Sequence, residues 1–361
     1  MRILYAIQGT GNGHICRAME IVPLLKKHFD VDVLISGTES DVELPFEVQF
    51  RFHGLSFVFG KKGGINLLKT YKKSRVGKLL KEIQQLDVSK YNLVINDFEP
   101  VSSWACYLKG VHCVALSHQA AVLHPLAPRP LKNDLLGRSV LKHYAPASAV
   151  YGFHFQPYGN EIFTPVIRSA VRNQPVEQQH HFTVYLPAYS DENIIKMLNH
   201  FPNSQWQVFS KHSNREYKSG HVEVIPINNE RFVRSMASSR GVVCGAGFET
   251  PAEALFLQKK LLVIPMRGQF EQQCNAAALR QMGVQVMKKF TKKHLGLLSV
   301  WIESNDVIAI NYPDHIEEIL TDIVSKHAMV ESPLKKIKER KSQVDSSRFK
   351  KFQLKRILKE I

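Results

Sequence analysis

The sequence has only five cysteines, and no two of them have the spacing of a metal-binding or redox pair. An odd and scattered set excludes a disulfide framework and a zinc site, so we expect free thiols in a reducing compartment. No apolar run approaches the roughly 20 residues of a membrane span, and the first apolar run is too short for a signal peptide. These absences predict a cytoplasmic protein. The cysteines are Cys16, Cys106, Cys113, Cys244 and Cys274.

Acidic residues are also scarce: 32 Asp and Glu stand against 48 Lys and Arg, which gives a formal charge of +16. The segment from Pro333 onward contributes eleven basic residues and three acids. Two interpretations stay open, a closing helix that packs on the body or a basic amphipathic segment that binds an anionic membrane. Nucleic acid is the weaker alternative as a partner. The apolar residues with near-helical spacing are Phe349, Phe352, Leu354, Ile357, Leu358 and Ile361.

Strand-like apolar runs alternate with helical patterns through both halves of the 361 residues, which predicts an α/β fold with parallel sheets. We expect a first Rossmann-like domain over 1–165, a polar linker over 166–180, a second Rossmann-like domain over 181–330 and the basic segment over 331–361. Parallel sheets bind ligands beyond the carboxyl ends of their strands. The functional site is therefore expected in a central cleft between two facing domains.

The first strand-like run leads into the loop GTGNGH, in which Gly11, Asn12 and Gly13 precede His14. A Walker loop needs Lys-Ser or Lys-Thr after its last glycine, and this loop lacks both. A dinucleotide loop needs a third glycine where His14 stands and an acid that closes the second strand, yet no acid occurs there before Glu39. What remains is a glycine turn with a His at the start of a helix, whose free amides attract anions, so Gly11, Asn12 and Gly13 are candidate donor-binding residues.

Two carboxylates end the run NLVINDFE, so Asp97 and Glu99 are expected at the same edge of the sheet as His14. An Asp beside a His fixes its tautomer and makes it a better base, which makes His14 and Asp97 the candidate catalytic pair. The alternative is that Asp97 caps the next helix and His14 caps its own. Glu99 and His118 are the candidate acceptor-side residues, with His118 and His124 expected as polar rim residues.

The second half contains a strand, a glycine turn and a helix in CGAGFETPAEALF. The turn lets the backbone approach a ligand, and the helix directs its first amides toward it. Glu253 is suited to two ribose hydroxyls, or it is a solvated first-turn acid favoured by the helix dipole. Glu271 and Gln272, in a later loop, suit sugar hydroxyls. Together these features describe a nucleotide-sugar site, whose turn comprises Gly245, Ala246 and Gly247.

The stretch from Cys244 to Leu279 resembles the donor-binding signature of GT-B glycosyltransferases. It is similar to UDP-glycosyltransferases and to the transferase that adds N-acetylglucosamine to the peptidoglycan lipid precursor. Upstream, RFVRSM resembles the segment in which a Phe stacks near uracil and the next backbone pairs with it, which implies these roles for Phe232 and Val233. GTGNGH and NDF are similar to the family's glycine-His loop and its Asp. The matching signature positions are Gly247, Thr250, Glu253, Pro265, Glu271, Gln272, Asn275 and Ala276.

The resemblance implies an inverting transferase that moves a hexose from a UDP-sugar to an acceptor hydroxyl. His14, oriented by Asp97, would deprotonate the hydroxyl, and helix amides would stabilise the leaving UDP. No metal or other cofactor is expected beyond the donor substrate. Gly245 stands where many UDP-glycosyltransferases place a His that touches the diphosphate, so diphosphate binding would depend on backbone amides.

Two alternatives are retained. A UDP-sugar 2-epimerase of the same fold would need several acids and bases around the sugar, of which Glu271 is the clear one. A non-catalytic binding protein would tolerate the loss of His14. The basic helical pattern over 66–85 and the basic segment also favour a lipid-linked or membrane-surface acceptor, with the protein peripheral on the inner face of the membrane.

Overall fold

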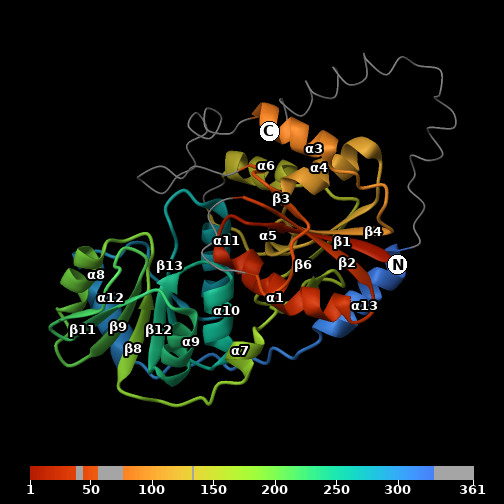
Figure 1. Cartoon of the computed structure of the whole chain (residues 1–361). Helices are drawn as coiled ribbons and strands as arrows, with labels where there is room; N and C mark the ends of the chain where they lie inside the picture. Colours follow the sequence, from red (N-terminus) through yellow and green to blue (C-terminus); the bar gives the residue numbers. More distant parts are fainter. Residues whose placement is uncertain (38–43, 56–75, 132–133, 329–361) are drawn as a thin grey trace, which may run out of the picture.

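The computed structural model describes residues 1–37, 44–55, 76–131 and 134–328, and Figure 1 shows them as two α/β units. Each unit is built on a mainly parallel sheet, which confirms the expected α/β class. Within these residues no helix is both long and apolar enough to cross a membrane. All five cysteines are free thiols, as the sequence predicts, and four of them are buried.

The first sheet has seven strands in the described part of the chain. They are β1 (Arg2–Gln8), β2 (Asp30–Ser36), β3 (Phe50–Phe52), β4 (Leu93–Asp97), β5 (Cys113–Leu116), β6 (Ala149–Phe153) and β7 (Ile162–Phe163). They pair in parallel in the order β3-β2-β1-β4-β5-β6-β7. The strand order reverses between β1 and β4, and a parallel sheet binds ligands at such a point.

Helices cover both faces of this first sheet. They are α1 (Asn12–Lys26), α3 (Val76–Gln85), α4 (Pro100–Lys109), α5 (His118–Val122), α6 (Leu135–Tyr144) and, from the end of the described chain, α13 (Ile316–His327). Along β1, Ile3, Tyr5 and Ile7 join the core that includes α1 and α13, whereas Leu4 and Ala6 join the core that includes α3 and α4. Figure 1 shows these helix pairs on opposite sides of the sheet. This alternation explains why the strand is apolar at every position from Ile3 to Ile7.

The second unit repeats the plan. Its strands are β8 (His181–Tyr185), β9 (Gln205–Ser210), β10 (Tyr217–Ser219), β11 (Val222–Pro226), β12 (Gly241–Gly245), β13 (Lys260–Ile264) and β14 (Gln285–Val286). They lie in the order β10-β11-β9-β8-β12-β13-β14, and within the described part of this sheet β10 and β11 pair antiparallel whereas the other neighbours pair in parallel. The carboxyl end of β12 carries the glycine turn predicted for the donor.

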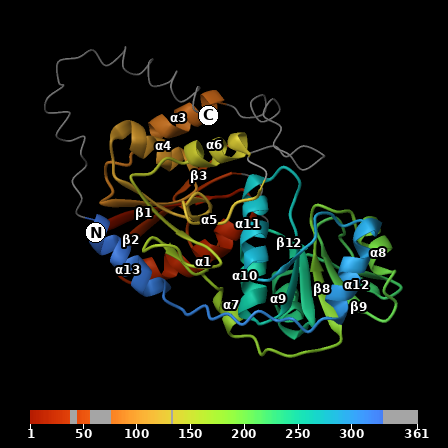
Figure 2. The same ribbon diagram turned by 180° about the vertical axis from the view of Figure 1, so that it is seen from behind.

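The helices of the second unit also lie on two faces. They are α8 (Asp191–Leu198), α9 (Asn229–Ser238), α10 (Glu249–Phe256), α11 (Phe270–Gln281), the short 3₁₀ helix η1 (Lys292–His294) and α12 (Leu295–Glu303). Residues of α8 and α12 share one core cluster, and those of α9, α10 and α11 share the cluster that continues into the first unit. Both views show α10 and α11 at the junction of the two units (Figures 1 and 2).

The last described helix returns to the first unit. Lys27 Nζ, just after α1, donates to Glu317 Oε2 at 3.2 Å, and His327 Nε2 lies 2.9 Å from the hydroxyl oxygen of Tyr151. Figure 2 shows α13 beside α1 and the N-terminus. The expected second domain over 181–330 is therefore too long, because the apolar face of α13 is buried in the core of the first sheet.

The segment 166–180 is more than a polar joint. It contains the short helix α7 (Ser169–Arg172), and its Ile167 and Val171 are buried. Ser169 donates to Glu20 of α1 at 2.6 Å. The segment is therefore packed at the junction, where the sequence pattern predicted only a linker. The basic segment 331–361 and the start of the basic helix predicted over 66–85 lie outside the described residues.

Candidate active site

His14 and Asp97 meet at the carboxyl end of the first sheet. His14 lies in the first turn of α1, which follows Gly11 at φ +96°, a value that favours glycine. Nδ1 of His14 lies 2.8 Å from Oδ1 of Asp97, the last residue of β4, and both side chains are buried. Nη2 of Arg17 lies 3.1 Å from the same nitrogen. Because an ionised carboxylate only accepts, we assign the imidazole proton to Nδ1 from the shorter contact with Asp97, which leaves Nε2 as a proton acceptor.

Two charged residues that the sequence patterns missed complete this arrangement. Arg17 donates from Nε and Nη2 to the two oxygens of Asp97 at 2.9 and 2.8 Å, and from Nη1 to Oε1 of Glu249 at 2.7 Å. Burial alone would raise the pKa of Asp97, but Arg17 and His14 hold it below its usual value. The available signal was the spacing of His14 and Arg17, which places them on one face of a helix.

Gln119 and Glu271 lie on the other side of the His14 ring. Nε2 of Gln119, from α5, is 3.3 Å from Nε2 of His14 and donates to Oε2 of Glu271 at 3.1 Å. Burial raises the pKa of Glu271. The accepting nitrogen of His14 thus points toward a carboxylate of the second unit. Phe98 has φ +57°, and its ring lies nearly parallel to that of His14, with 6.4 Å between the ring centroids.

The structure corrects the two acceptor-side predictions. Glu99 accepts from the amides of Val101 and Ser102 at 2.7 and 2.6 Å and so caps α4, the role that the alternative interpretation assigned to Asp97. Burial raises the pKa of this carboxyl. Because both oxygens serve the helix N-terminus and the side chain is fully buried, Glu99 has no face for an acceptor.

His118 is likewise buried, not a rim residue. Its ring stacks on Phe248 of the second unit with 3.8 Å between centroids, and its Nε2 lies 2.8 Å from Oδ1 of Asn275. Its Nδ1 lies 2.9 Å from the carbonyl oxygen of Phe153. Burial holds the pKa of His118 well below its usual value. His118 is therefore part of the contact between the units, and this position follows from the packing of α5 against α11.

The predicted donor turn lies at the carboxyl end of β12. Ala246 is buried, and its carbonyl accepts from Nδ2 of Asn275 at 3.1 Å. A methyl group built on Gly247 would meet no described atom within 4 Å, so its backbone faces open space. Gly245 and Thr250 are half-buried on either side of this position. The glycine loop of the first unit comes close, since a Cβ on Gly13 would lie 3.1 Å from Cγ of Glu249.

Glu253 and Gln272 already have partners within the protein. Arg168 forms a two-pronged ion pair with Glu253, with Nη2 donating to Oε2 at 2.8 Å, and Glu253 is buried. Glu253 is therefore not a solvated first-turn acid. If it binds a ribose, the ribose hydroxyls share its carboxylate with Arg168. Oε1 of Gln272 accepts from the amide of Met266 at 2.9 Å, which shapes the loop before α11.

Phe232 and Val233 lie in the core of the second unit. The ring of Phe232 packs on Tyr185 and Phe209 with centroid separations of 5.5 and 5.1 Å, and Val233 is buried. The expectation that Phe232 stacks near uracil is wrong for this arrangement, because the amphipathic helix α9 turns this side chain toward the sheet. Pairing of the Val233 backbone with uracil stays a prediction.

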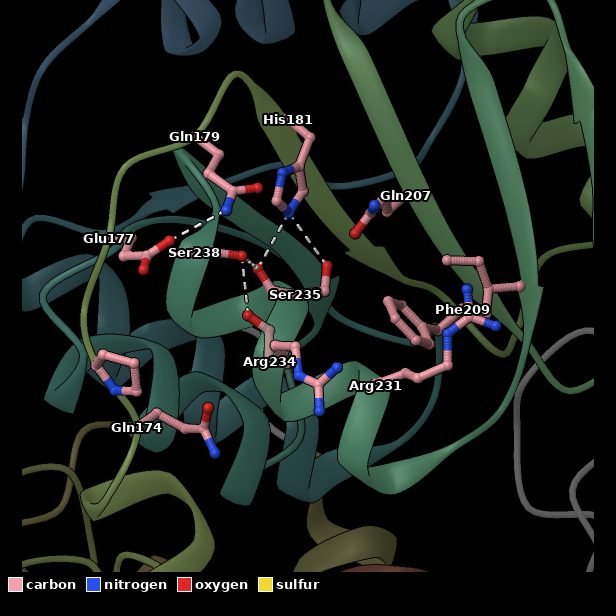
Figure 3. A pocket seen from close by; sticks show the side chains of 12 residues that line it. Gln174, Glu177, Gln179, His181, Gln207, Phe209, Arg231, Arg234, Ser235 and Ser238 are labelled. Carbon is pink, nitrogen blue, oxygen red and sulfur yellow. Dashed lines mark hydrogen bonds between the residues drawn. The ribbon is translucent and has the colours of Figure 1, made fainter.

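Two cavities in the described part of the structure bear on the location of the site. One, of about 550 Å³, lies in the first unit and is bounded by Phe98 and Gln119, the two residues that flank the His14 ring. Figure 3 shows the other, of about 370 Å³, between α9 and the segment before β8. Its two arginines form ion pairs with glutamates: Arg231 with Glu216 and Arg234 with Glu230. None of the predicted site residues lines this second cavity.

The described residues contain no cluster of three or more His, Cys, Asp or Glu side chains that could hold a metal ion. Asp30 and Asp32 form an Asp-x-Asp triplet, but they begin β2, at the end of the sheet opposite His14. Asp32 accepts from Arg2 at 2.9 Å and from the hydroxyl of Tyr91 at 2.6 Å. The triplet therefore lies at the amino ends of the strands, away from His14, where Asp32 is hydrogen-bonded within the protein.

The sequence matches a known protein family. Residues 1–299 match the family model described as glycosyl transferase family 1. The chain belongs to this family. The protein is thus a glycosyltransferase, and the interpretation as a non-catalytic binding protein was wrong. No curated protein sequence matches this glycosyltransferase.

Solved structures show that the glycosyltransferase has the two-domain GT-B fold that the sequence predicts. MurG of Acinetobacter baumannii aligns with a TM-score of 0.55 and 13% identity, over 90% of this chain and 99% of that chain. SnogD of Streptomyces nogalater aligns with a TM-score of 0.54 and 12% identity, over 90% and 99%. A UDP-N-acetylglucosamine 2-epimerase aligns with a TM-score of 0.54 and 13% identity, over 92% and 98%. The likeness at such identities concerns the fold alone.

Proposed function

We propose that this glycosyltransferase moves a hexose from a UDP-sugar to an acceptor hydroxyl, with inversion of the anomeric carbon and without a metal ion. The observation that carries the proposal is the 2.8 Å contact between Nδ1 of His14 and Asp97. It leaves Nε2, which lies 3.3 Å from Nε2 of Gln119, as the nitrogen that takes the proton of a hydroxyl when His14 acts as general base. The ionised Asp97 then stabilises the imidazolium that forms.

The proposed step exchanges one bond for another. The acceptor oxygen forms a bond to the anomeric carbon from the face opposite the diphosphate, while the bond from that carbon to the β-phosphate oxygen breaks. The hydroxyl proton passes to Nε2 of His14, and the bonding electrons leave with UDP. The N-terminus of α10, next to the open backbone of Gly247, offers amides for the charge that develops on the diphosphate.

The cavity of about 550 Å³ supports an acceptor with an apolar body. Oε1 of Gln119 is buried without a partner in the described structure, so it can accept a hydrogen bond from an acceptor hydroxyl beside His14. His124, expected as a rim residue, lines the same cavity. The apolar part of the lining includes Phe98, Leu123, Leu141, Pro146 and Val150.

Exposed leucines lie on the same chain segments as residues of the acceptor cavity, since Leu126 follows Pro125 and α6 also contains Leu141, and they support a membrane-surface acceptor. Leu126, Leu135 and Leu136 are 67%, 69% and 57% exposed, and α6 also contains the basic residues Arg138 and Lys142. Apolar and basic side chains on one surface suit the interface of an anionic bilayer. We therefore propose that the enzyme works as a peripheral protein on an anionic membrane, with the basic segment 331–361 as a second point of attachment.

Sedimentation with vesicles tests the membrane proposal. The protein should pellet with vesicles that contain anionic lipid and be released by salt, and replacement of Leu135 and Leu136 by Gln should reduce pelleting. Removal of the chain from Pro333 onward should reduce it further while the melting temperature is kept. Equal pelleting with neutral and anionic vesicles, or none with either, would exclude this attachment.

The donor is tested first by thermal stabilisation with UDP, GDP, CMP, TDP, ADP and NAD. A ligand at 100 times its dissociation constant adds about 2.7 kcal/mol to the free energy of unfolding, which a melting curve detects. A selective response to UDP would support the donor class. UDP-sugars are then incubated with and without alcohol acceptors, and the anomeric proton of the product shows inversion or retention. Accumulation of a 2-epimer without an acceptor would favour the epimerase instead.

A further inference from the structure

Arg17 links the catalytic pair to the second unit. Its side chain is 2% exposed, and its Nε and Nη2 are used by Asp97, whereas Nη1 crosses to Glu249 at 2.7 Å. Glu249 is the first residue of α10 and is 20% exposed at the side chain. The two carboxylates thus hold different edges of one guanidinium, and only one of them belongs to the domain of Arg17.

The carboxylate of Glu249 lies where the proposed donor diphosphate needs to bind. It is at the N-terminus of α10, and its Cγ is 3.1 Å from the position of a Cβ on Gly13 in the glycine loop. Helix N-termini attract anions, and a carboxylate on a guanidinium makes the same kind of contact as a phosphate. Phe248, at the N-cap, provides no side-chain cap for this helix.

We infer that Arg17 is the cation that binds the donor diphosphate, and that Glu249 occupies its Nη1 edge until the donor arrives. This inference rests on the proposed function. On binding, the carboxylate of Glu249 turns away from Arg17, and Nη1 donates to a diphosphate oxygen. Arg17 then neutralises part of the charge that builds up on UDP when the bond to the sugar breaks. The same guanidinium keeps Asp97 ionised, so donor binding and the base are joined through one side chain.

Two observations show why Glu249 is the partner that yields. Asp97 is fully buried and is held by Arg17 through two bonds, whereas Glu249 is partly exposed and is held through one. Burial also raises the pKa of Glu249 to about 7, so its ionised form is poorly stabilised in this position despite Arg17. An incoming diphosphate therefore displaces the weaker of the two contacts.

The decisive experiment compares Glu249→Gln with the parent enzyme by calorimetric titration of UDP, inorganic pyrophosphate and uridine at about pH 8. Because Gln keeps the shape but removes the competing charge, UDP and pyrophosphate should bind about tenfold tighter and uridine equally well. The matched control is Glu230→Gln in the first turn of α9, whose exposed side chain pairs with Arg234. Weaker or unchanged pyrophosphate and UDP binding in Glu249→Gln would overturn the inference.

Arg17 is tested by Arg17→Lys and Arg17→Gln, each read by UDP affinity and kcat. Arg17→Lys keeps the positive charge and should retain part of the UDP affinity. Arg17→Gln should lose the UDP affinity, and adding Glu249→Gln to it should no longer make UDP bind more tightly. Because Arg17→Gln removes a partner of the buried Asp97, a melting curve checks that this variant folds. If it does not fold, the titration of Glu249→Gln decides the inference. Uridine has no phosphate, so its affinity should be unchanged if Arg17→Gln removes only the cation and should fall if the site is distorted.

The outcomes also separate this inference from the proposed function. If the parent enzyme transfers a sugar from a UDP-sugar but Glu249→Gln binds pyrophosphate no tighter, the inference fails and the proposed function stands. If the parent enzyme ignores uridine nucleotides while Glu249→Gln binds pyrophosphate more tightly, the anion site stands and the UDP assignment fails.

Discussion

Nδ1 of His14 lies 2.8 Å from the buried carboxylate of Asp97, at the point where strand order reverses between β1 and β4. His14→Ala should lower turnover by about 10² to 10⁴-fold, since the general base is lost. UDP affinity should stay close to that of the parent enzyme. His212→Ala, in an exposed loop of the second unit, is the control and should leave turnover unchanged. Full activity of His14→Ala would remove His14 from the mechanism.

Glu249 predicts a pH dependence of stability. Burial raises its pKa from 4.5 to about 7, so between these values the folded chain holds a proton that the unfolded chain has released. Stability contributed by this group is therefore present at low pH and lost as pH rises through the folded pKa. As pH rises across this range, the free energy of unfolding of Glu249→Gln should increase by up to about 3 kcal/mol relative to that of the parent enzyme. Urea unfolding at about pH 5 and pH 8 measures it, and a constant difference would contradict the raised pKa.

We expect the ion pair of Arg168 and Glu253 to make a large contribution to the free energy of unfolding. Arg168→Gln leaves the buried carboxylate of Glu253 without its two-pronged partner, which typically costs about 3 to 5 kcal/mol of unfolding free energy. The exposed pair of Arg231 and Glu216 provides the contrast, and Arg231→Gln should cost about 0 to 1 kcal/mol. Urea denaturation of both variants gives the comparison. Equal costs would mean that Arg168 is not held as the structure shows.

Gly247 tests the backbone approach to the donor. A methyl group at this position meets no described atom within 4 Å, so Gly247→Ala should keep the melting temperature of the parent enzyme. If the diphosphate contacts this backbone, the same methyl group should weaken UDP binding by about tenfold or more. Thermal shift with and without UDP measures both effects at once. Unchanged UDP affinity would place the diphosphate elsewhere.

The cysteines and the apolar strands could be predicted because each depends on local sequence. Apolar runs such as those in Arg2–Gln8 and Lys260–Ile264 are strands in the structure, and each glycine turn follows a strand as expected. The last helix was not predicted to return to the first sheet, because an amphipathic pattern does not say which core its apolar face will join. Glu99 was misassigned for a similar reason. The sequence around Pro100 is the same whether the carboxylate before it caps a helix or faces a binding site.

The sequence by itself determined the two-unit α/β plan, the glycine turns at the strand ends and the positions of His14 and Asp97, because strand alternation and turn chemistry are properties of neighbouring residues. Only the tertiary structure decided how the charges pair. Arg17 and Glu249 are 232 positions apart, and Arg168 and Glu253 are 85 apart. No local pattern connects such residues, and they meet because the packing of two separate sheets brings the ends of their strands and helices together.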